Sequence, residues 1–366
     1  MAFTTADLTP SELSAQLQAA GLSAADAASI IAFLNPGADG LIPVETATTA
    51  GNPVPEVLAP DGDRPQVLDL QSAVNTVNLD AVETFPDLRA IVQSGDHADL
   101  TVNSNNVSAD VWAGGGNGNV VTVQENLGTL HGGSGVNQNL TLFATDIGTL
   151  IEGSGNHQTA TLHGAIVAAT GYGGSGERDV LNGIGEHISL IGGTGNNQRY
   201  SLEGRADTLA VGSGNNDVAN VGGQFVTATG GSGNNDVLNV SAAVSSTISE
   251  GSGNNQVINA SDSIGCTFHG GGGHNDKLNI ASGHSVIADG GGANQHILAS
   301  GGSDILNLTP GKHETVDLAS SGHNVVNVAA SSGNVTISGA TSTDTINIAE
   351  GAHVHVVGVD PTIHYV

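Results

Sequence analysis

The sequence predicts an all-β protein, a two-sided parallel β-solenoid with about 20 residues per coil and a small N-terminal helical hairpin. Gly supplies 54 of the 366 residues, whereas aromatic residues supply 3%. Glycine-rich turns recur at a nearly constant interval, and short segments of period-two alternation follow them. Because few large side chains are present to fill a thick core, stability is expected from regular backbone pairing over thin layers of small aliphatic residues.

The interval between turns defines the coil. Turns of the Gly-Ser-Gly type recur every 19 to 21 residues, ending at Gly135, Gly155, Gly176, Gly195, Gly214, Gly233, Gly253 and Gly273. The segment after each turn reads Asp, Gln or Asn, any residue, apolar, Asn or Thr, apolar, as in Asp236-Val237-Leu238-Asn239-Val240. A second strand starts about ten residues later, at Thr129, Thr149, Ser189, Thr208, Thr227, Thr247 and Thr267. Each coil is therefore expected to hold two strands.

Three regions are predicted along the chain: a helical hairpin at 1–36, a Pro-rich linker or edge segment at 37–70, and the β-solenoid repeat domain at 71–366. More than half of the ten prolines lie between residues 36 and 66, at Pro36, Pro43, Pro53, Pro55, Pro60 and Pro65. Proline lacks the N–H that a central strand donates, so this composition favours a linker or an edge.

The hairpin is predicted from capping signals. Thr9 and Glu12 form a capping box with Pro10 at the first helical position, and Gly21 ends the helix. Ser23 and Asp26 repeat the capping arrangement, and the second helix ends at Asn35-Pro36-Gly37. Helices this short are not stable alone. They are expected to pack on the end of the solenoid or on another molecule.

Two columns are expected to face outward from the main strands, at the second and fourth positions of the repeated segment. The second position places an apolar strip on this face, at Val180, Val218, Val237, Val257 and Val325. Such a strip marks an interface with another rod, the N-terminal segment or a partner, and it becomes core if the strand register is reversed. The fourth position supplies an asparagine ladder, in which amides bond from coil to coil, at Asn182, Asn220, Asn239, Asn259 and Asn327.

The turns resemble those of the RTX proteins, whose nonapeptide Gly-Gly-x-Gly-x-Asp-x-apolar-x forms a calcium-binding parallel β-roll. Gly301-Gly302-Ser303-Asp304-Ile305-Leu306 is close to this pattern, and Gly230-Gly231-Ser232-Gly233-Asn234-Asn235-Asp236-Val237-Leu238 fits it with one residue inserted. The resemblance implies that Asp side chains of neighbouring coils hold calcium together with turn carbonyls. It also implies export without a cleaved N-terminal signal, by a one-step type I route.

The Asp position of that motif varies in this chain. It is read as Asn119, Gln138, Gln158, Asp179, Gln198, Asp217, Asp236, Gln256, Asp276, His296, Asp304, Glu314, Asn324 and Asp344. This variation favours a neutral ladder of amides over a continuous file of calcium sites. We expect no required cofactor, with calcium confined to the candidates Asp304, Glu314 and Asp344.

Charge and motifs exclude several function classes. The net charge is −28, from 35 acidic residues against 7 Lys and Arg, so nucleic acid and anionic membrane surfaces would repel the chain. No apolar run predicts a membrane span, and the N-terminus is expected to carry no Sec-type signal. The tight turns are expected to leave little room for a cleft, and no phosphate loop, nucleophile elbow or Cys-His metal spacing occurs in the sequence. We assign no catalytic residue and predict that the chain is not an enzyme.

Two remaining residue types are given structural interpretations. Cys266 is expected to pack inward as a small apolar residue. His353 and His355 alternate onto one face and are interpreted as surface histidines, so no metal is assigned to them.

We therefore expect an extracellular structural protein. It would self-assemble into a filament, surface layer or biofilm-matrix fibre through the solenoid ends and the N-terminal region. Its partner is a further copy of itself, at the cell surface or in a matrix. The alternative is a secreted adhesin or calcium-dependent RTX-type effector. Ice binding through the single Thr column is a lesser alternative.

Overall fold

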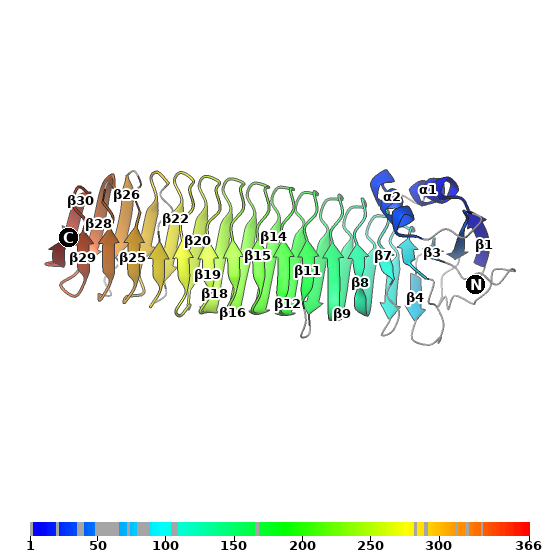
Figure 1. The fold of residues 1–366 in the computed structure, drawn as a ribbon, viewed down its shortest axis with the longest axis horizontal. Coiled ribbons are helices and arrows are strands. Elements are labelled where there is room, and N and C mark those ends of the chain that lie inside the picture. Colours follow the sequence, from blue (N-terminus) through cyan, green and yellow to red (C-terminus); the bar gives the residue numbers. More distant parts are fainter. Residues whose placement is uncertain are drawn as a thin grey trace. The chain divides into compact units, whose positions relative to one another are not determined.

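The protein consists mainly of short parallel strands, with helices near the N-terminus of the described chain (Figure 1). The computed structural model describes residues 3–19, 22–34, 40–47, 66–71, 74–78, 88–103, 109–164, 168–281, 284–288, 292–309, 311, 313–318, 322–330 and 332–366. These residues fall into two compact units, Met1–Ser189 and Leu190–Val366. The predicted fold class is confirmed, since the chain forms an all-β parallel solenoid with a small N-terminal helical part.

In the first unit, parallel strands stack into two sheets. One sheet contains β4, β6, β8, β9, β10 and β12, and the other contains β2, β3, β5, β7, the later parts of β8 and β9, and β11. The strands are β1 (Phe3–Leu8), β2 (Ile42–Ala47), β3 (Val67–Leu70), β4 (Val74–Asn78), β5 (Ala90–Gln93), β6 (Asp99–Asn103), β7 (Asp110–Trp112), β8 (Val120–His131), β9 (Asn139–Ile151), β10 (Thr159–Gly164), β11 (Ala169–Tyr172) and β12 (Val180–Glu186). The chain divides into its two units within β13 (Ile188–Ile191).

In the second unit, each strand up to β29 pairs in parallel with the strand two places further along the chain. Even-numbered strands form the first sheet and odd-numbered strands the second. The strands are β14 (Arg199–Arg205), β15 (Thr208–Ala210), β16 (Val218–Gln224), β17 (Thr227–Thr229), β18 (Val237–Val244), β19 (Thr247–Ser249), β20 (Val257–Ser261), β21 (Thr267–His269), β22 (Lys277–Ala281), β23 (Val286–Ala288), β24 (His296–Ala299), β25 (Ile305–Leu308), β26 (Glu314–Leu318), β27 (Val325–Val328), β28 (Asn334–Ala340), β29 (Thr345–Ile348), β30 (His353–Gly358) and β31 (Thr362–Tyr365).

The strand register places the apolar third and fifth positions of the repeated segment inside the solenoid. In β18, Leu238 and Val240 are buried, whereas Val237 and Asn239 are half-buried on the outer face. The same alternation occurs in β20. Strands such as β19 and β20 contribute only one or two buried side chains each, so the core is thin, and it consists mostly of Leu, Ile, Val and Ala.

The two helices in the described residues, α1 (Pro10–Ala19) and α2 (Ala24–Phe33), begin at the predicted caps. The Thr9 N–H donates to Glu12 Oε2 at 2.9 Å, and the Glu12 N–H donates to Thr9 Oγ1 at 3.3 Å. The Asp26 N–H donates to Ser23 Oγ at 3.0 Å. These reciprocal bonds satisfy N–H groups that lack partners within the helix. The predicted helix stops at Gly21 and at Asn35-Pro36-Gly37 lie outside the described residues.

The hairpin packs on the outer face of a sheet of its own unit. Leu13 and Leu17 of α1 and Ile30 of α2 join one apolar cluster with residues of β2, β3, β5 and β7. The sheet contributes Ile42, Val44, Val67, Ala90, Val92 and Trp112. Gln16 Nε2 also donates to the buried Asp69 Oδ2 at 3.0 Å. The helices therefore cover a sheet face, whereas the sequence left open an end of the solenoid or another molecule.

A strand before the hairpin was not foreseen. β1 pairs antiparallel with β2, from Phe3 opposite Ala47 to Leu8 opposite Ile42. β2 and β3 lie inside the predicted linker or edge segment, and they pair in parallel with each other. Leu68 and Leu70 of β3 are fully buried. Pro36, Pro53, Pro55, Pro60 and Pro65 of this segment lie outside the described residues, whereas Pro43 lies within β2.

Turn glycines are required where the backbones of successive coils approach most closely. A Cβ placed on Gly155 would lie 1.9 Å from the carbonyl oxygen of Gly135, and one on Gly233 would lie 1.6 Å from that of Gly214. Any side chain here would push the stacked turns apart. This contact explains why the last glycine of each turn recurs with the period of the coil.

No helix in the described parts of the chain has the length and apolar character needed to cross a membrane.

Two adjacent glycines test this interpretation of the turns. We expect Gly273→Ala to lower the free energy of unfolding by about 3 kcal/mol. Its Cβ would lie 1.9 Å from the carbonyl oxygen of Gly253. Gly272→Ala is the matched control, because a Cβ there meets nothing within 4 Å, and its effect should stay within about 0.5 kcal/mol. Urea unfolding followed by circular dichroism measures both, and equal losses would contradict the interpretation.

Candidate functional site

The predicted Val strip is divided among three places. Val218, Val237 and Val257 lie in register on the first sheet of the second unit, half-buried and facing outward. Arg199 precedes them in register and Lys277 follows. Val325 lies on the other sheet of that unit, in register with Ile305 and Thr345. Val180 lies in the first unit, in register with Thr159. The apolar strip is therefore three residues long.

The predicted asparagines form ladders on both sheets. On the first sheet of the second unit, Asn239 Nδ2 donates to Asn220 Oδ1 at 3.1 Å, and Asn259 Nδ2 donates to Asn239 Oδ1 at 3.0 Å. The ladder continues to Asn279, whose Nδ2 donates to Asn259 Oδ1 at 2.8 Å. Asn327 belongs to a separate ladder on the second sheet with Asn307 and Asn347. In the first unit, Asn182 Nδ2 donates to Thr161 Oγ1 at 3.3 Å.

Two further asparagine ladders follow the turns, and the sequence analysis missed them. The first Asn of each Gly-Asn-Asn turn accepts the backbone N–H of the next coil, as when the Asn234 N–H donates to Asn215 Oδ1 at 2.8 Å. The second Asn has a left-handed backbone, with φ of 64° at Asn235, and its Nδ2 donates to Asn216 Oδ1 at 3.2 Å. Asn tolerates this conformation better than most residues. The repeated Asn-Asn pair could have revealed both ladders.

A column of buried polar side chains runs along the inside of the turns, three residues after the last glycine of each. We call it the turn column. It comprises Asn119, Gln138, Gln158 and Asp179 in the first unit, and Gln198, Asp217, Asp236, Gln256, Asp276, Gln295 and Glu314 in the second. All of them are at most 2% exposed. The assignment of His296 was wrong, because Gln295 lies opposite Asp276 and His296 lies opposite Lys277. The constant spacing of three from Gly292 could have identified Gln295.

Glutamine in the turn column bonds to the turn backbone. Gln158 Oε1 accepts the Gly153 N–H at 2.8 Å, and Gln158 Nε2 donates to the carbonyls of Gly133 and Gly135 at 2.8 and 3.1 Å. Gln256 repeats this pattern, with Nε2 donating to Gly231 and Gly233 at 2.9 and 3.1 Å. Gln158 and Gln256 thus supply donors to carbonyls of the preceding coil, which would otherwise be buried without partners.

Aspartate in the turn column bonds differently. Asp179 Oδ1 accepts the backbone N–H of Gln158 at 2.9 Å, and Asp217 Oδ1 accepts that of Gln198 at 2.8 Å. Burial raises the pKa of Asp179 to about 6 and that of Asp217 to about 7, in the latter case together with the charge of Asp236. Burial likewise raises the pKa of Asp236 to about 6.

The three candidate calcium residues do not come together. Glu314 belongs to the turn column of the first sheet. Asp304 and Asp344 precede strands of the second sheet, two coils apart, with Asn324 between them. The Asp304 N–H donates to Asn324 Oδ1 at 3.1 Å, and the Asn324 N–H donates to Asp344 Oδ1 at 2.8 Å. Within the described ranges, no three His, Cys, Asp or Glu side chains form a group that could hold a metal ion.

Cys266 lies in the corresponding column of the second sheet, between Ser246 and Ser285 in register. It is buried, and its Sγ donates to the Ala243 carbonyl at 3.4 Å. Burial raises the pKa of this thiol. Its inward position is as predicted, and its column holds both polar residues and the buried Val226.

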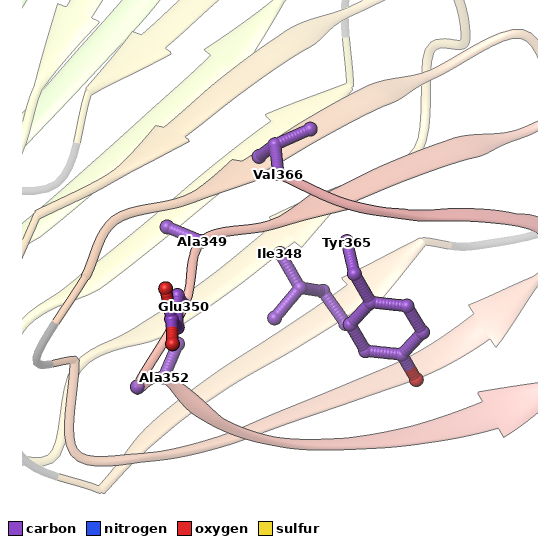
Figure 2. A pocket seen from close by; sticks show the side chains of 7 residues that line it. Ile348, Ala349, Glu350, Ala352, Tyr365 and Val366 are labelled. Carbon is purple, nitrogen blue, oxygen red and sulfur yellow. The ribbon is translucent and has the colours of Figure 1, made fainter.

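The last coil exposes side chains whose register partners in the preceding coil are buried. Ile363 lies opposite the buried Ile346 and is 37% exposed, and Tyr365 lies opposite Ile348 and is 81% exposed. Val354 and Val356 of β30 are half-buried in the same way. A hollow of about 400 Å³ lies at this place, lined by Ile348, Ala349, Glu350, Gly351, Ala352, Tyr365 and Val366. Figure 2 shows the side chains around it. His353 and His355 are exposed on the outer face of β30.

Comparison with known proteins found no matching family model, no matching curated protein and no matching solved structure. The RTX resemblance therefore stays a prediction.

The turn column is tested by removing one amide. We expect Gln256→Leu to lower the free energy of unfolding by about 3 kcal/mol, because the Gly251 N–H and the carbonyls of Gly231 and Gly233 lose a buried partner. The exposed Gln224 provides the control, and Gln224→Leu should change the value by about 0.5 kcal/mol or less. Urea unfolding measures both variants. A loss in Gln256→Leu no larger than in the control would contradict the structural role of the column.

Proposed function

We propose that the chain is an extracellular structural protein that assembles end to end with further copies of itself. The observation that carries this proposal is the exposed core of the last coil. Ile363 and Tyr365 have the register of core residues but face solvent, and a further coil would cover them. A second copy supplies such a coil without any new type of contact.

Backbone edges support the same contact. In the described part of the chain, β30 and β31 have a paired neighbour on one side, β28 and β29 respectively. β1 likewise pairs with β2 alone among the described strands. Among the described strands, β1, β30 and β31 thus each have one edge without a paired strand. Such edges favour a head-to-tail contact between copies, which continues into a filament when it does not close into a ring.

The surface of the described chain favours a structural role over catalysis or ligand binding. Gln158 and Gln256 in the turns donate to the backbone of the preceding coil, and the Asn ladders occupy outward positions that a ligand would need. The strongly acidic composition keeps the sides of such a filament soluble and apart. We place the protein outside the cell or at its surface, reached by a type I-like route, and we expect no catalytic activity.

Assembly is tested on the purified protein. Electron microscopy and light scattering with EDTA and with calcium, run in parallel, should show filaments in both conditions. Particles of single-copy mass in both conditions would refute the proposal, and filaments with calcium alone would favour an RTX-type mechanism.

The contact itself is tested by charge at the last coil. We expect the double substitution Ile363→Asp and Tyr365→Asp to abolish filaments, because two carboxylates would be buried at the junction without partners. Ile264→Asp is the matched control, since Ile264 is 62% exposed in the same unit and far from the C-terminus in sequence. Deleting residues 1–7 tests β1 as the opposing edge, and unchanged filaments would remove β1 from the contact. Electron microscopy at equal protein concentration compares all variants.

A further inference from the structure

Glutamine and aspartate place different atoms at the same point of the turn. A Cβ on Gly155 would lie 1.9 Å from the Gly135 carbonyl oxygen and 2.9 Å from Gln158 Nε2. A Cβ on Gly176 would lie 1.9 Å from the Gly155 carbonyl oxygen and 2.6 Å from Asp179 Oδ2. At Gly214 the corresponding distances are 1.7 Å to the Gly195 carbonyl oxygen and 3.1 Å to Asp217 Oδ2. The Asp oxygen thus lies beside the last glycine of its turn, where the Gln amide nitrogen lies in other coils.

This exchange replaces a hydrogen-bond donor by an acceptor. Gln158 Nε2 donates to the Gly135 carbonyl at 3.1 Å. Asp179 Oδ2 and Asp217 Oδ2 are buried and have no hydrogen-bond partner in the structure. Both side chains are at most 1% exposed, so bulk water does not reach them. An ionised carboxylate accepts hydrogen bonds only, and it would oppose a backbone carbonyl that also only accepts.

The chain contains a neutral form of the same arrangement. Asn119 occupies the turn column, and a Cβ on Gly116 would lie 2.7 Å from its Nδ2. That Nδ2 donates to the Ala113 carbonyl at 3.1 Å. Asn has the shape of a protonated Asp, and the outer atom of each can donate a hydrogen bond at this position. The stacked turns therefore accept a short side chain when its outer atom donates.

We propose that Asp179 and Asp217 are protonated on Oδ2 in mildly acidic solution, where they donate to the turn backbone as Gln and Asn do, and that the solenoid loosens at these turns when the proton leaves. The proton comes from solvent, and no covalent bond other than O–H forms or breaks. The protonation of Asp179 and Asp217 thus makes the stability of the stacked turns depend on the pH of the solution.

The neighbouring charged groups are consistent with this role. Asp217 faces Asp236 of the following coil, whose Oδ1 accepts the Asp217 N–H at 3.0 Å and whose charge raises the pKa of Asp217. In the preceding coil it faces the neutral Gln198, and Arg199 is exposed on the outer face. Asp179 faces Glu152 and His157. Burial and the charge of Asp179 raise the pKa of Glu152 to about 8, whereas His157 lowers that of Asp179.

The direction of the pH dependence follows from the raised pKa of Asp217. An Asp in the unfolded chain has a pKa of about 3.9, and the folded value is about 7. Between these values the folded state binds more protons, so stability decreases as pH rises. The contribution of protonated Asp217 to the free energy of unfolding is complete below the pKa of Asp in the unfolded chain. It is lost as pH rises through the pKa of Asp217 in the folded protein.

Asp217→Asn separates this effect from the overall charge of the chain. In EDTA, we expect its Tm to exceed that of the wild type by about 3 °C at about pH 8.5 and to match it at about pH 5, because the amide supplies the donor at every pH. Glu203→Gln removes one negative charge from an exposed position of the same unit, and it should keep the wild-type pH dependence. Thermal unfolding followed by circular dichroism measures all three proteins.

Three results would overturn the proposal. The first is an Asp217→Asn Tm at about pH 8.5 that is equal to or below that of the wild type. The second is a wild-type Tm that calcium raises at that pH as much as the substitution does, since a cation would then fill the position. The third needs no variant, and it is the absence of a protonated-carboxyl band in the infrared spectrum of the wild type at about pH 6, above the range in which exposed carboxyls titrate.

Discussion

The backbone of each glycine turn packs directly against the backbone of the turn in the preceding coil. The rest of the structure depends on this contact between turns. The carbonyl of one turn lies where the next turn would carry a Cβ, so glycine is required at Gly155, Gly233 and their equivalents. The contact fixes the interval between turns and, through it, the register of the strands. It also buries carbonyls and N–H groups that need partners. The turn column exists because those groups lie too deep for water.

The polar residues of the described chain follow from this requirement. Gln158 and Gln256 supply two donors and one acceptor to the turns, whereas Asp179 and Asp217 accept a backbone N–H of the preceding coil through Oδ1 and hold Oδ2 buried without a hydrogen-bond partner. On the outside, stacked Asn side chains bond to one another at the coil repeat. Side-chain hydrogen bonds between coils, both inside the turns and on the outer face, thus add to the backbone hydrogen bonds of the strands. With this support, a core of small aliphatic side chains is sufficient.

A solenoid stacked in this way has no intrinsic end. The N-terminal hairpin covers a sheet face through Leu13, Leu17 and Ile30. The last coil presents Ile363 and Tyr365 as if another coil followed. The proposed assembly extends the contact between coils to a contact between copies, and the buried acids of the turn column link the tightness of stacking to pH. Both proposals arise from the same feature, namely that the apolar and polar groups of a coil are covered by the adjacent coil.

The period of the glycine turns and the alternation after them determined the fold class, the two strands per coil and the outward positions of Val237 and Asn239, because these depend on local backbone geometry. The capping boxes at Thr9 and Ser23 determined the helix starts for the same reason. Tertiary structure alone decided which sheet each residue joins, so it separated Val325 and Asn327 from their predicted columns and Glu314 from Asp304. It also decided that β1 pairs with β2 and that the hairpin lies on a sheet face. Partners distant in sequence set these features, and no local pattern records them. The position of Asp179 Oδ2 and Asp217 Oδ2 beside a turn glycine is another feature that the tertiary structure decided, because it depends on how closely two coils stack.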